Sequence, residues 1–489
     1  EKMKKQKFDL AIIGGGITGA GVARDAASRG MKVALIEKND FASGTSSRSS
    51  KLIHGGIRYL ENLEFHLVYE ALSERSLLFE MAPHLVHPLR FLFPVYKDSR
   101  VGMTKLGMGM WLYDILSTFE TPELHERLTK SQSLHRMPIL KEEGLKGSFV
   151  YSDAYMDDDR LVHETMRSAN EFGACMANYV EAIGADFEGE KLSKIVCRDL
   201  EGDQEFYIEA KHFISTVGPW TDRVAERLLN PWTSIMRPSK GIHLTLHKSR
   251  LPLKSAVVMG SGKDNRIVFG IPRHEMVIVG TTDTDFDQDP GEVTTTPEDV
   301  RYLLSIVEEY FPGAKIKQED ILASYAGVRP LVHDGSSTES STSREHIILS
   351  DMRNITLVAG GKYTTYRRMA EQTVEAALTQ FTIEDQARFQ NSETKQALNP
   401  KVNMNRYGLA LSRVESCSKE LGVSMEDALL LLQRHGEEAF ELCKYLDFNL
   451  SKDSNAKLWQ LEAAHAIETT MCSHLVDFFT RRTPLFLSR

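Results

Sequence analysis

A glycine-rich turn near the N-terminus has the residue types and spacing of a dinucleotide site. Gly14, Gly16 and Gly19 follow a short apolar segment, and a second apolar segment ends at Glu37. Glycine permits the tight turn, the approach of backbone to a pyrophosphate and close helix packing. The N–H groups that begin the next helix favour phosphate oxygens, and a carboxylate at Glu37 can accept hydrogen bonds from a ribose. The pattern predicts a bound dinucleotide; the alternative is an ordinary βαβ unit.

A second candidate segment, residues 45–61, is dense in hydroxyl, glycine and basic side chains. It contains Gly55-Gly56 beside His54, Arg58 and Tyr59. Hydroxyls can donate to phosphate oxygens, and glycines let the backbone approach a flat ring. This composition favours contact with a ligand over a solvated serine-rich loop.

Composition limits the classes of protein to consider. The 489 residues are enough for two or three domains. A net charge of −9 argues against general nucleic-acid binding. Five dispersed cysteines indicate a reducing compartment and no structural zinc. The sequence contains no pattern typical of a signal peptide or a transmembrane helix.

The elements that must position these residues are not contiguous. Strand-like segments end in glycine at Gly14, Gly218 and Gly360, so early, middle and late parts of the chain must form one sheet. Such interruption favours a flavoprotein over an NAD-dependent dehydrogenase. Helices are expected over 62–82, 159–172 and 297–311, with a linker at 390–400. The expected division is a dinucleotide domain of 1–75, 150–225 and 350–384, a substrate-binding cap of 76–149 and 226–349, and a helical domain of 400–489.

Taken together, the motifs resemble those of the FAD-dependent glycerol-3-phosphate dehydrogenases. The resemblance rests on Gly14–Gly19, 49–61, 151–153, 157–158, 218–220, 280–283, 327–330 and 360–367, in that order. It implies an α/β fold. A Rossmann-like FAD-binding domain of the glutathione-reductase or D-amino-acid-oxidase type would carry an inserted antiparallel β-rich substrate domain and a C-terminal helical domain. FAD is expected to bind tightly without a covalent anchor.

The resemblance also implies an activity. The protein would oxidise sn-glycerol 3-phosphate to dihydroxyacetone phosphate and pass the electrons to a membrane quinone. It would then be cytoplasmic and peripheral on the inner face of the membrane. The alternatives are an oxidase that produces hydrogen peroxide, an amine- or amino-acid-oxidising flavoenzyme and a non-catalytic FAD-binding protein. The oligomeric state stays open, with a homodimer as one alternative.

Basic residues within these motifs are candidates for binding the substrate phosphate, since the arginine fork matches its oxygens. The substrate site is expected to contain Arg58, Tyr59, Arg329, Arg344 and Lys362. The C2 hydroxyl must lose a proton, and histidine has a suitable pKa. The resemblance favours His243 as base, with His54 and Lys362 as alternatives; a buried structural histidine is the competing interpretation. Arg329, Lys362 and His243 are therefore the catalytic candidates.

The FAD-binding residues follow from the same motifs. Gly360-Gly361 should bring backbone N–H groups against the flavin's pyrimidine edge, where positive potential stabilises the reduced anion. The full set expected to bind FAD is Gly14, Gly16, Ile17, Thr18, Gly19, Glu37, Thr45, Ser46, Ser47, Ser50, Leu52, His54, Val180, Gly218, Trp220, Gly361, Lys362 and Thr364.

Two further patterns have alternative interpretations. Three adjacent carboxylates, Asp157 to Asp159, could hold a metal, but a solvated turn or helix start is favoured and no metal is expected. Residues 89–112 place Arg90, Lys97, Arg100 and Lys105 among large apolar side chains. This segment fits either contact with an anionic membrane surface or a buried helix with snorkelling lysines.

Overall fold

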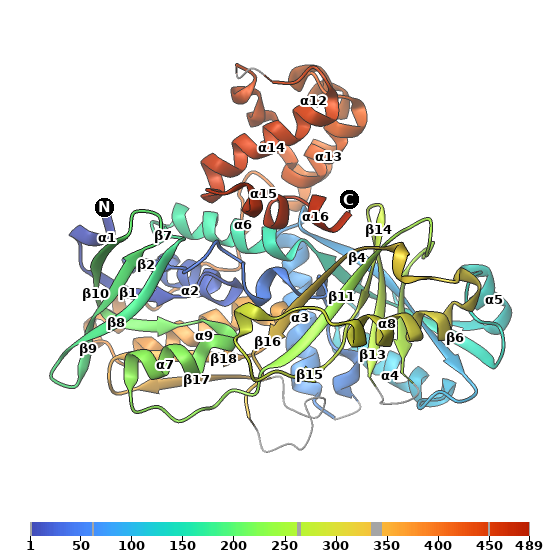
Figure 1. Ribbon diagram of the computed structural model, residues 1–489, viewed down its shortest axis with the longest axis horizontal. Helices are drawn as coiled ribbons and strands as arrows, with labels where there is room; N and C mark the ends of the chain where they lie inside the picture. Colours follow the sequence, from blue (N-terminus) through green and yellow to red (C-terminus); the bar gives the residue numbers. More distant parts are fainter. Residues whose placement is uncertain (1, 61–62, 262–265, 334–344, 448–449, 489) are drawn as a thin grey trace.

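The computed structural model describes residues 2–60, 63–261, 266–333, 345–447 and 450–488. Two sheets lie side by side, and a helical domain stands over them (Figure 1). Each sheet contains strands from separate early and late parts of the chain, so neither sheet is formed by one continuous segment.

The first sheet is the dinucleotide-type sheet. Its central order is β17 (His346–Asp351), β18 (Ile355–Gly360), β10 (Gln204–Ser215), β1 (Phe8–Ile13), β2 (Val33–Ile36) and β7 (Cys175–Ala177). The pairs from β18 to β7 are parallel, while β17 is antiparallel to β18. An antiparallel extension from β10 adds β9 (Lys191–Asp199) and β8 (Val180–Glu188). Early, middle and late segments thus meet, as the interrupted pattern predicted.

Helices cover both faces of this sheet, which explains its uninterrupted apolar strands. On one face, α2 (Ile17–Ser28) packs between α6 (Asp158–Glu171) and α9 (Tyr366–Leu378). The alanines of α2 are buried and allow this close approach. On the other face, α7 (Thr221–Leu229) packs in a core with Phe213 and Leu357.

The second sheet is mainly antiparallel. Its order is β15 (Thr284–Asp285), β11 (Ser239–His247), β14 (Met276–Gly280), β13 (Ile267–Arg273), β12 (Ala256–Gly260), β4 (Val86–Tyr96), β6 (Leu145–Met156) and β3 (Leu52–Ile53). Strand β16 (Ile321–Arg329) pairs with β11, and β5 (Glu126–Thr129) pairs with β6. Helix α8 (Pro297–Tyr310) covers one face; α3 (Phe65–Met81) and α4 (Met103–Leu116) cover the other. The short helix α5 (Lys130–Arg136) follows β5.

The segment 89–112 is not the single helix that one of its two interpretations required. Its first part is strand β4, in which Phe91 is buried and Arg90 forms ion pairs with Glu126 and Glu123. Only the second part is helical, as α4. Cross-strand pairing with β6 determines the strand, and no single-helix pattern could have shown it. The boundary expected at residue 150 also lies inside β6.

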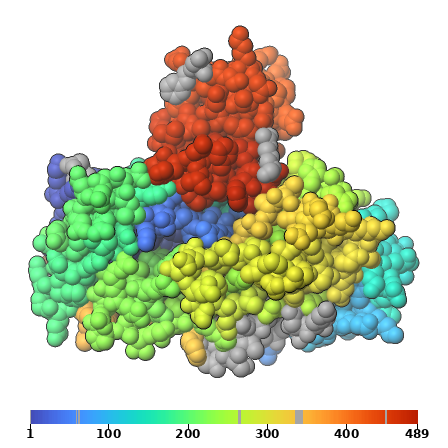
Figure 2. Space-filling view, in the orientation of Figure 1, coloured from blue at the N-terminus to red at the C-terminus, as the bar shows by residue number. Residues whose placement is uncertain are grey.

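The C-terminal domain has its own helical core. Its elements are α11 (Met404–Leu411), α12 (Val414–Leu421), α13 (Met425–His435), η9 (Gly436–Tyr445), α14 (Ser454–Thr470), α15 (Leu475–Arg481) and α16 (Leu485–Ser488), preceded by α10 (Ile383–Arg388). Figure 2 shows its red base resting on the blue N-terminal segment. Among the helices described, none is long and apolar enough to cross a bilayer.

Candidate active site

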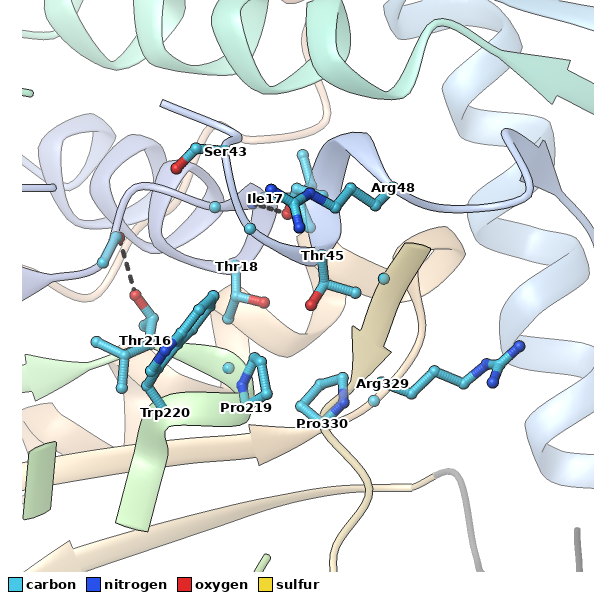
Figure 3. A pocket seen from close by; sticks show the side chains of 18 of the residues that line it. Ile17, Thr18, Ser43, Thr45, Arg48, Thr216, Pro219, Trp220, Arg329 and Pro330 are labelled. Atoms are coloured by element: carbon cyan, nitrogen blue, oxygen red, sulfur yellow. Dashed lines mark hydrogen bonds between the residues drawn. The ribbon is translucent and has the colours of Figure 1, made fainter. Parts of the chain in front are cut away.

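A cavity of about 530 Å³ is lined by residues from both sheets. At one end lies the glycine turn between β1 and α2, and at the other lie the ends of β11 and β16. Figure 3 shows Thr18, Thr45 and Trp220 near the turn, and Arg329 extending away from them. The arrangement can hold a long ligand with two chemically different ends.

The glycine turn has the geometry that a dinucleotide requires. Gly14 has a φ of +110°, and a Cβ there would lie 2.8 Å from the carbonyl oxygen of Thr216. A Cβ at Gly19 would collide with the carbonyl oxygen of Gly14. Gly16, Ile17 and Thr18 line the cavity at the start of α2. The N-terminus of that helix therefore opens onto the cavity and favours an anion there.

Glu37 lies in the cavity wall at the end of β2. Its carboxylate accepts hydrogen bonds from the N–H groups of Gly15 (2.7 Å) and Asn39 (2.9 Å). Burial raises the pKa of Glu37. Val180, also in the wall, donates its N–H to the carbonyl oxygen of Glu37 at 2.8 Å. A carboxylate has about four acceptor positions, so the fixed side chain can still accept from ribose hydroxyls.

The serine-rich segment forms one long side of the cavity. Ser46 Oγ accepts from the N–H of Ile17 at 2.9 Å, and Thr45 Oγ1 donates to the carbonyl of Val328 at 2.6 Å. His54 and Thr364 are joined by hydrogen bonds between the backbone of His54 and Thr364 Oγ1 (3.2 and 3.3 Å). The segment is thereby attached to α2, to β16 and to the turn that follows β18. Further expected residues that line the cavity are Ser50, Leu52, Gly218, Trp220 and Gly361.

His243 on β11 is buried at the other end of the cavity. Its Nε2 lies 2.8 Å from Ser50 Oγ, and its ring stacks on Tyr325 with centroids 4.7 Å apart. Burial, with smaller contributions from Arg329 and Lys51, lowers the pKa of His243 to about 3. The ring is therefore neutral near pH 7, and it is a weaker base than the ordinary histidine on which the expectation rested.

Two cations lie in the same wall. Arg329, the last residue of β16, donates to Thr281 Oγ1 (2.9 Å), the carbonyl of Thr282 (3.0 Å) and Asp283 Oδ1 (3.1 Å). Lys362 Nζ lies 4.0 Å from the ring centroid of Tyr59. These contacts hold both cations in the cavity wall.

Some residues expected in the site are not among the described residues that line the cavity. Gly19 and Ser47 are described but are not among the residues that line the cavity. Arg344 and the side chain of Arg58 lie outside the part of the structure that can be described. The structure adds Arg48, whose pKa burial lowers, and Tyr325. Arg48 belongs to the serine-rich segment, so its sequence position could have marked it as a candidate site residue. Tyr325 lies in a strand, and nothing else in its sequence surroundings indicates a role in the site.

The clustered acidic residues form ion pairs. Asp158 is buried against Lys51 and Ser49, and Asp157 pairs with Arg273, so these two carboxylates are not the solvated turn that was favoured. They do begin helix α6.

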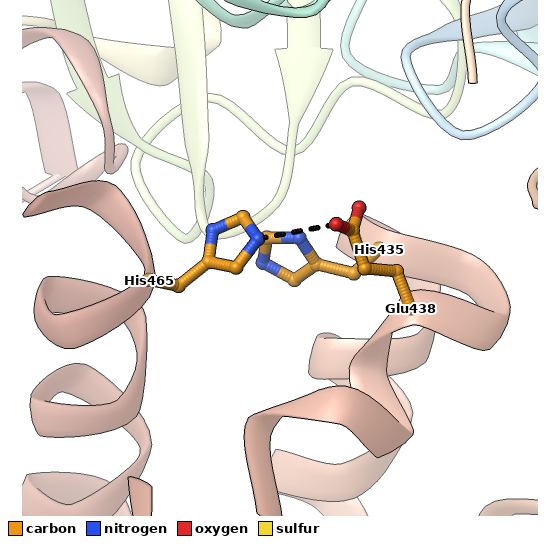
Figure 4. Close-up of side chains that lie close together, drawn as sticks. All are labelled: His435, Glu438 and His465. Atoms are coloured by element: carbon orange, nitrogen blue, oxygen red, sulfur yellow. Dashed lines mark ion pairs between the residues drawn. The ribbon is translucent and has the colours of Figure 1, made fainter. Parts of the chain in front are cut away.

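A second cluster joins His435, Glu438 and His465 in the helical domain (Figure 4). Glu438 accepts hydrogen bonds from Arg167 and Asn399. Arg434 and His435 both pair with Glu462. Since arginines already neutralise these carboxylates, the contacts favour a buried ion-pair network over metal ligation.

Comparison with known proteins agrees with this geometry. A family profile described as FAD dependent oxidoreductase matches residues 9–367. The aerobic glycerol-3-phosphate dehydrogenase of Bacillus subtilis (strain 168) is 37% identical over 490 residues, which cover 98% of this chain and 88% of that protein.

Solved structures extend the comparison. The glycerol-3-phosphate dehydrogenase from Bacillus halodurans, complexed with FAD, has a TM-score of 0.83 at 29% identity and covers 100% of this chain and 88% of its own. An L-alpha-glycerophosphate oxidase from Mycoplasma pneumoniae has a TM-score of 0.58 at 19% identity, covering 76% of this chain and 95% of its own, and shows a shared fold alone.

The residues present fit FAD. The turn that excludes any Cβ at Gly14 and Gly19, the helix start beside it and the fixed carboxylate of Glu37 are the parts that a dinucleotide needs. With the match over residues 9–367 and 37% identity over nearly the whole chain, this protein belongs to the FAD-dependent oxidoreductases and, among them, to the aerobic glycerol-3-phosphate dehydrogenase family.

Proposed function

We propose that this protein oxidises sn-glycerol 3-phosphate to dihydroxyacetone phosphate and passes the electrons to a membrane quinone. One observation supports this most directly: Arg329, Lys362 and the neutral His243 line the same cavity as the dinucleotide turn. Two cations suit a phosphate dianion, and a neutral imidazole suits proton removal.

The residues of the chain divide the reaction between them. Arg329 and Lys362 bind the substrate phosphate and orient the C2 carbon. His243, held by Ser50 and Tyr325, accepts the proton of the C2 hydroxyl on its ring. FAD, when bound, supplies the acceptor for the hydride that leaves C2. The glycine turn, Glu37 and the serine-rich segment hold it.

A dye-reduction assay tests this proposal. Glycerol 3-phosphate is compared with glycine and sarcosine, and peroxide is measured in the same samples. The proposal is supported if glycerol 3-phosphate reduces the dye while glycine and sarcosine do not, if no peroxide forms, and if the electrons also pass to a soluble quinone. Stoichiometric peroxide identifies an oxidase, reduction by glycine or sarcosine identifies an amine oxidase, and a flavoprotein inert to all three contradicts every catalytic interpretation.

We also propose contact with an anionic membrane surface through α4. Met108, Trp111 and Ile115 are 64%, 57% and 54% exposed on this helix, at spacings that place them on one side. Lys97, Arg100 and Lys105 are exposed close to them in sequence. Exposed apolar residues with adjacent cations are typical of a helix lying in a lipid interface.

Liposome flotation measures this contact. Trp111→Glu should release the protein from vesicles that contain anionic lipid. Ile467→Glu is the matched control, because Ile467 is 66% exposed on α14 in the other domain. Wild-type protein that fails to float at low salt, or equal loss in both variants, would exclude α4 as the contact.

A further inference from the structure

The C-terminal tail reaches the wall of the FAD site through a buried carboxylate. Asp40 follows β2 and is fully buried. Arg482 donates to both of its oxygens (2.7 and 2.9 Å), and Arg481 donates to Oδ2 at 2.7 Å. Burial raises the pKa of Asp40, but the bonds and charge of Arg482, with the nearby His163 and Arg481, together outweigh it and hold the pKa well below its usual range. This is a fully charged pair formed across more than 400 residues of sequence.

Other contacts attach the same tail to Asn178 and Tyr179, which follow β7, the strand beside β2. Asn178 Nδ2 donates to the carbonyl of Met471 (3.0 Å) and to Asp40 Oδ1 (3.2 Å). Tyr179 donates its hydroxyl to Asp477 Oδ2 at 2.6 Å. Arg482 is itself held, because it donates to Thr470 Oγ1 (2.8 Å) and to the Thr470 carbonyl (2.9 Å). Residues 470–483, called here the anchoring tail, therefore contact the loops that follow β2 and β7 at several points.

Asp40 lies within the loop that forms the nucleotide end of the cavity. Lys38, Asn39 and residues 43–46 line the cavity, while Asp40 is not in the wall formed by the described residues. The loop is attached to the glycine turn by the N–H of Ala42, which donates to the carbonyl of Gly15 at 3.0 Å. The two arginines on Asp40 are a further attachment, beside the N–H of Tyr179, which donates to the carbonyl of Asn39 at 3.1 Å. A loop attached at several points has fewer conformations to lose when a ligand binds.

We propose that the anchoring tail is a positioning element for FAD. Arg481 and Arg482 act through Asp40 to hold the Glu37–Ser46 wall in the shape that binds the nucleotide end of the cofactor. They are positioning residues, since neither lines the cavity in the described chain. The proposal also predicts the reverse effect: FAD must strengthen the docking of the tail, because coupling between two binding events is reciprocal.

FAD affinity of the deflavinated protein tests the first direction. Arg482→Ala and Arg481→Ala should each raise the Kd for FAD, titrated by flavin fluorescence, about tenfold, within the range of ordinary coupling between sites. Arg482→Lys keeps a charge but loses the fork, and should recover part of the affinity.

Glu438→Gln is the matched control. Arg167 and Glu438 form another buried pair between the body and the helical domain, and neither lines the cavity in the described residues. This variant should lower the urea midpoint of unfolding as the arginine variants do, while the Kd for FAD stays within about twofold. Equal loss of FAD affinity in the control, or none in either arginine variant, would overturn the proposal.

Hydrogen exchange of the wild-type protein tests the reverse effect, that of FAD on the docking of the tail. Because it needs no variant, this test remains possible even if Arg482→Ala does not fold. Addition of FAD to the deflavinated protein should slow amide exchange in residues 470–483 at least severalfold, with little change in α12 and α13. Exchange in the tail that is the same with and without FAD would contradict reciprocal coupling.

Discussion

His243 and Ser50 lie 193 positions apart in the sequence and 2.8 Å apart in space. The contact, with the stacked ring of Tyr325, holds the imidazole at the cavity. Burial keeps that ring neutral. At the scale of single residues the site therefore combines a neutral imidazole with two cations whose own partners hold them in place.

The two cations should contribute to substrate turnover rather than to cofactor retention. Arg329→Ala and Lys362→Ala each remove a charge-assisted bond to the phosphate, so kcat/KM for glycerol 3-phosphate should fall roughly 10- to 100-fold. The flavin absorbance per protein should stay unchanged. Arg223→Ala, at the nucleotide end of the cavity, is the control and should leave KM for the substrate unaltered. Colourless Arg329 or Lys362 variants would contradict these roles.

The lowered pKa of His243 has a consequence for pH dependence. The proposed base is the neutral form of His243, and with a pKa near 3 that form is almost fully populated from pH 5 upward. We expect kcat/KM, which reports the free enzyme, to show no acidic limb that belongs to this residue between pH 5 and 8. His243→Asn should lower kcat by about 10²- to 10⁴-fold while FAD stays bound. A limb near pH 6.5 that disappears in the variant would show that the histidine titrates normally.

At the scale of elements, the nucleotide site depends on the close packing of α2 against the glycine turn that follows β1. Gly19 lets the helix lie against the turn at Gly14, and Thr216 from β10's end closes the other side. Helix α4 illustrates the same dependence on neighbours, because its buried face packs under the second sheet while Trp111 remains exposed.

Substitution at Gly19 tests this close packing of α2 against the glycine turn. A methyl group in Gly19→Ala collides with backbone that cannot move away, so we expect a loss of about 1–3 kcal/mol in the free energy of unfolding and poor FAD retention. Gly109→Ala in α4 is the control, because a Cβ there meets nothing within 4 Å. It should be neutral or slightly stabilising. Urea unfolding and flavin content measure both variants, and equal effects would argue against a steric role.

At the scale of the whole molecule, many histidines are buried in the uncharged form. Burial lowers the pKa of His84 to about 3, and that of His212 and His435 to about 4. An unfolded chain protonates these groups near pH 6.5. The unfolded state therefore binds more protons between about pH 6.5 and 4, and stability falls as the pH falls through that window.

Urea unfolding at several pH values measures this effect. The free energy of unfolding should be highest above about pH 6.5 and should decrease toward pH 5. Each such histidine contributes up to about 1.4 kcal/mol per pH unit. His84→Gln should flatten the slope relative to the wild type. A stability that is constant from pH 7 to 5, or an unchanged slope in the variant, would show that these side chains are not buried uncharged.

The sequence alone determined the chemistry that depends on local spacing. The glycine turn, Glu37 and the serine-rich segment could be assigned because adjacent residues impose a turn, a helix start and a run of donors. The ordered motifs also led to the family, which the full-length similarity confirms. Helix α8 was expected nearly to its observed bounds, since Thr296 and Asp299 form a local capping box.

Tertiary structure alone decided the contacts made between distant residues. The strand conformation of 86–96, the pairing of Ser50 with His243 and the stacking of Tyr325 depend on partners far along the chain. The attachment of the helical tail to Asp40 is of the same kind. The spacing of apolar residues along the sequence does not indicate such contacts, because burial and ion pairing are properties of the assembled sheets and helices rather than of any one segment.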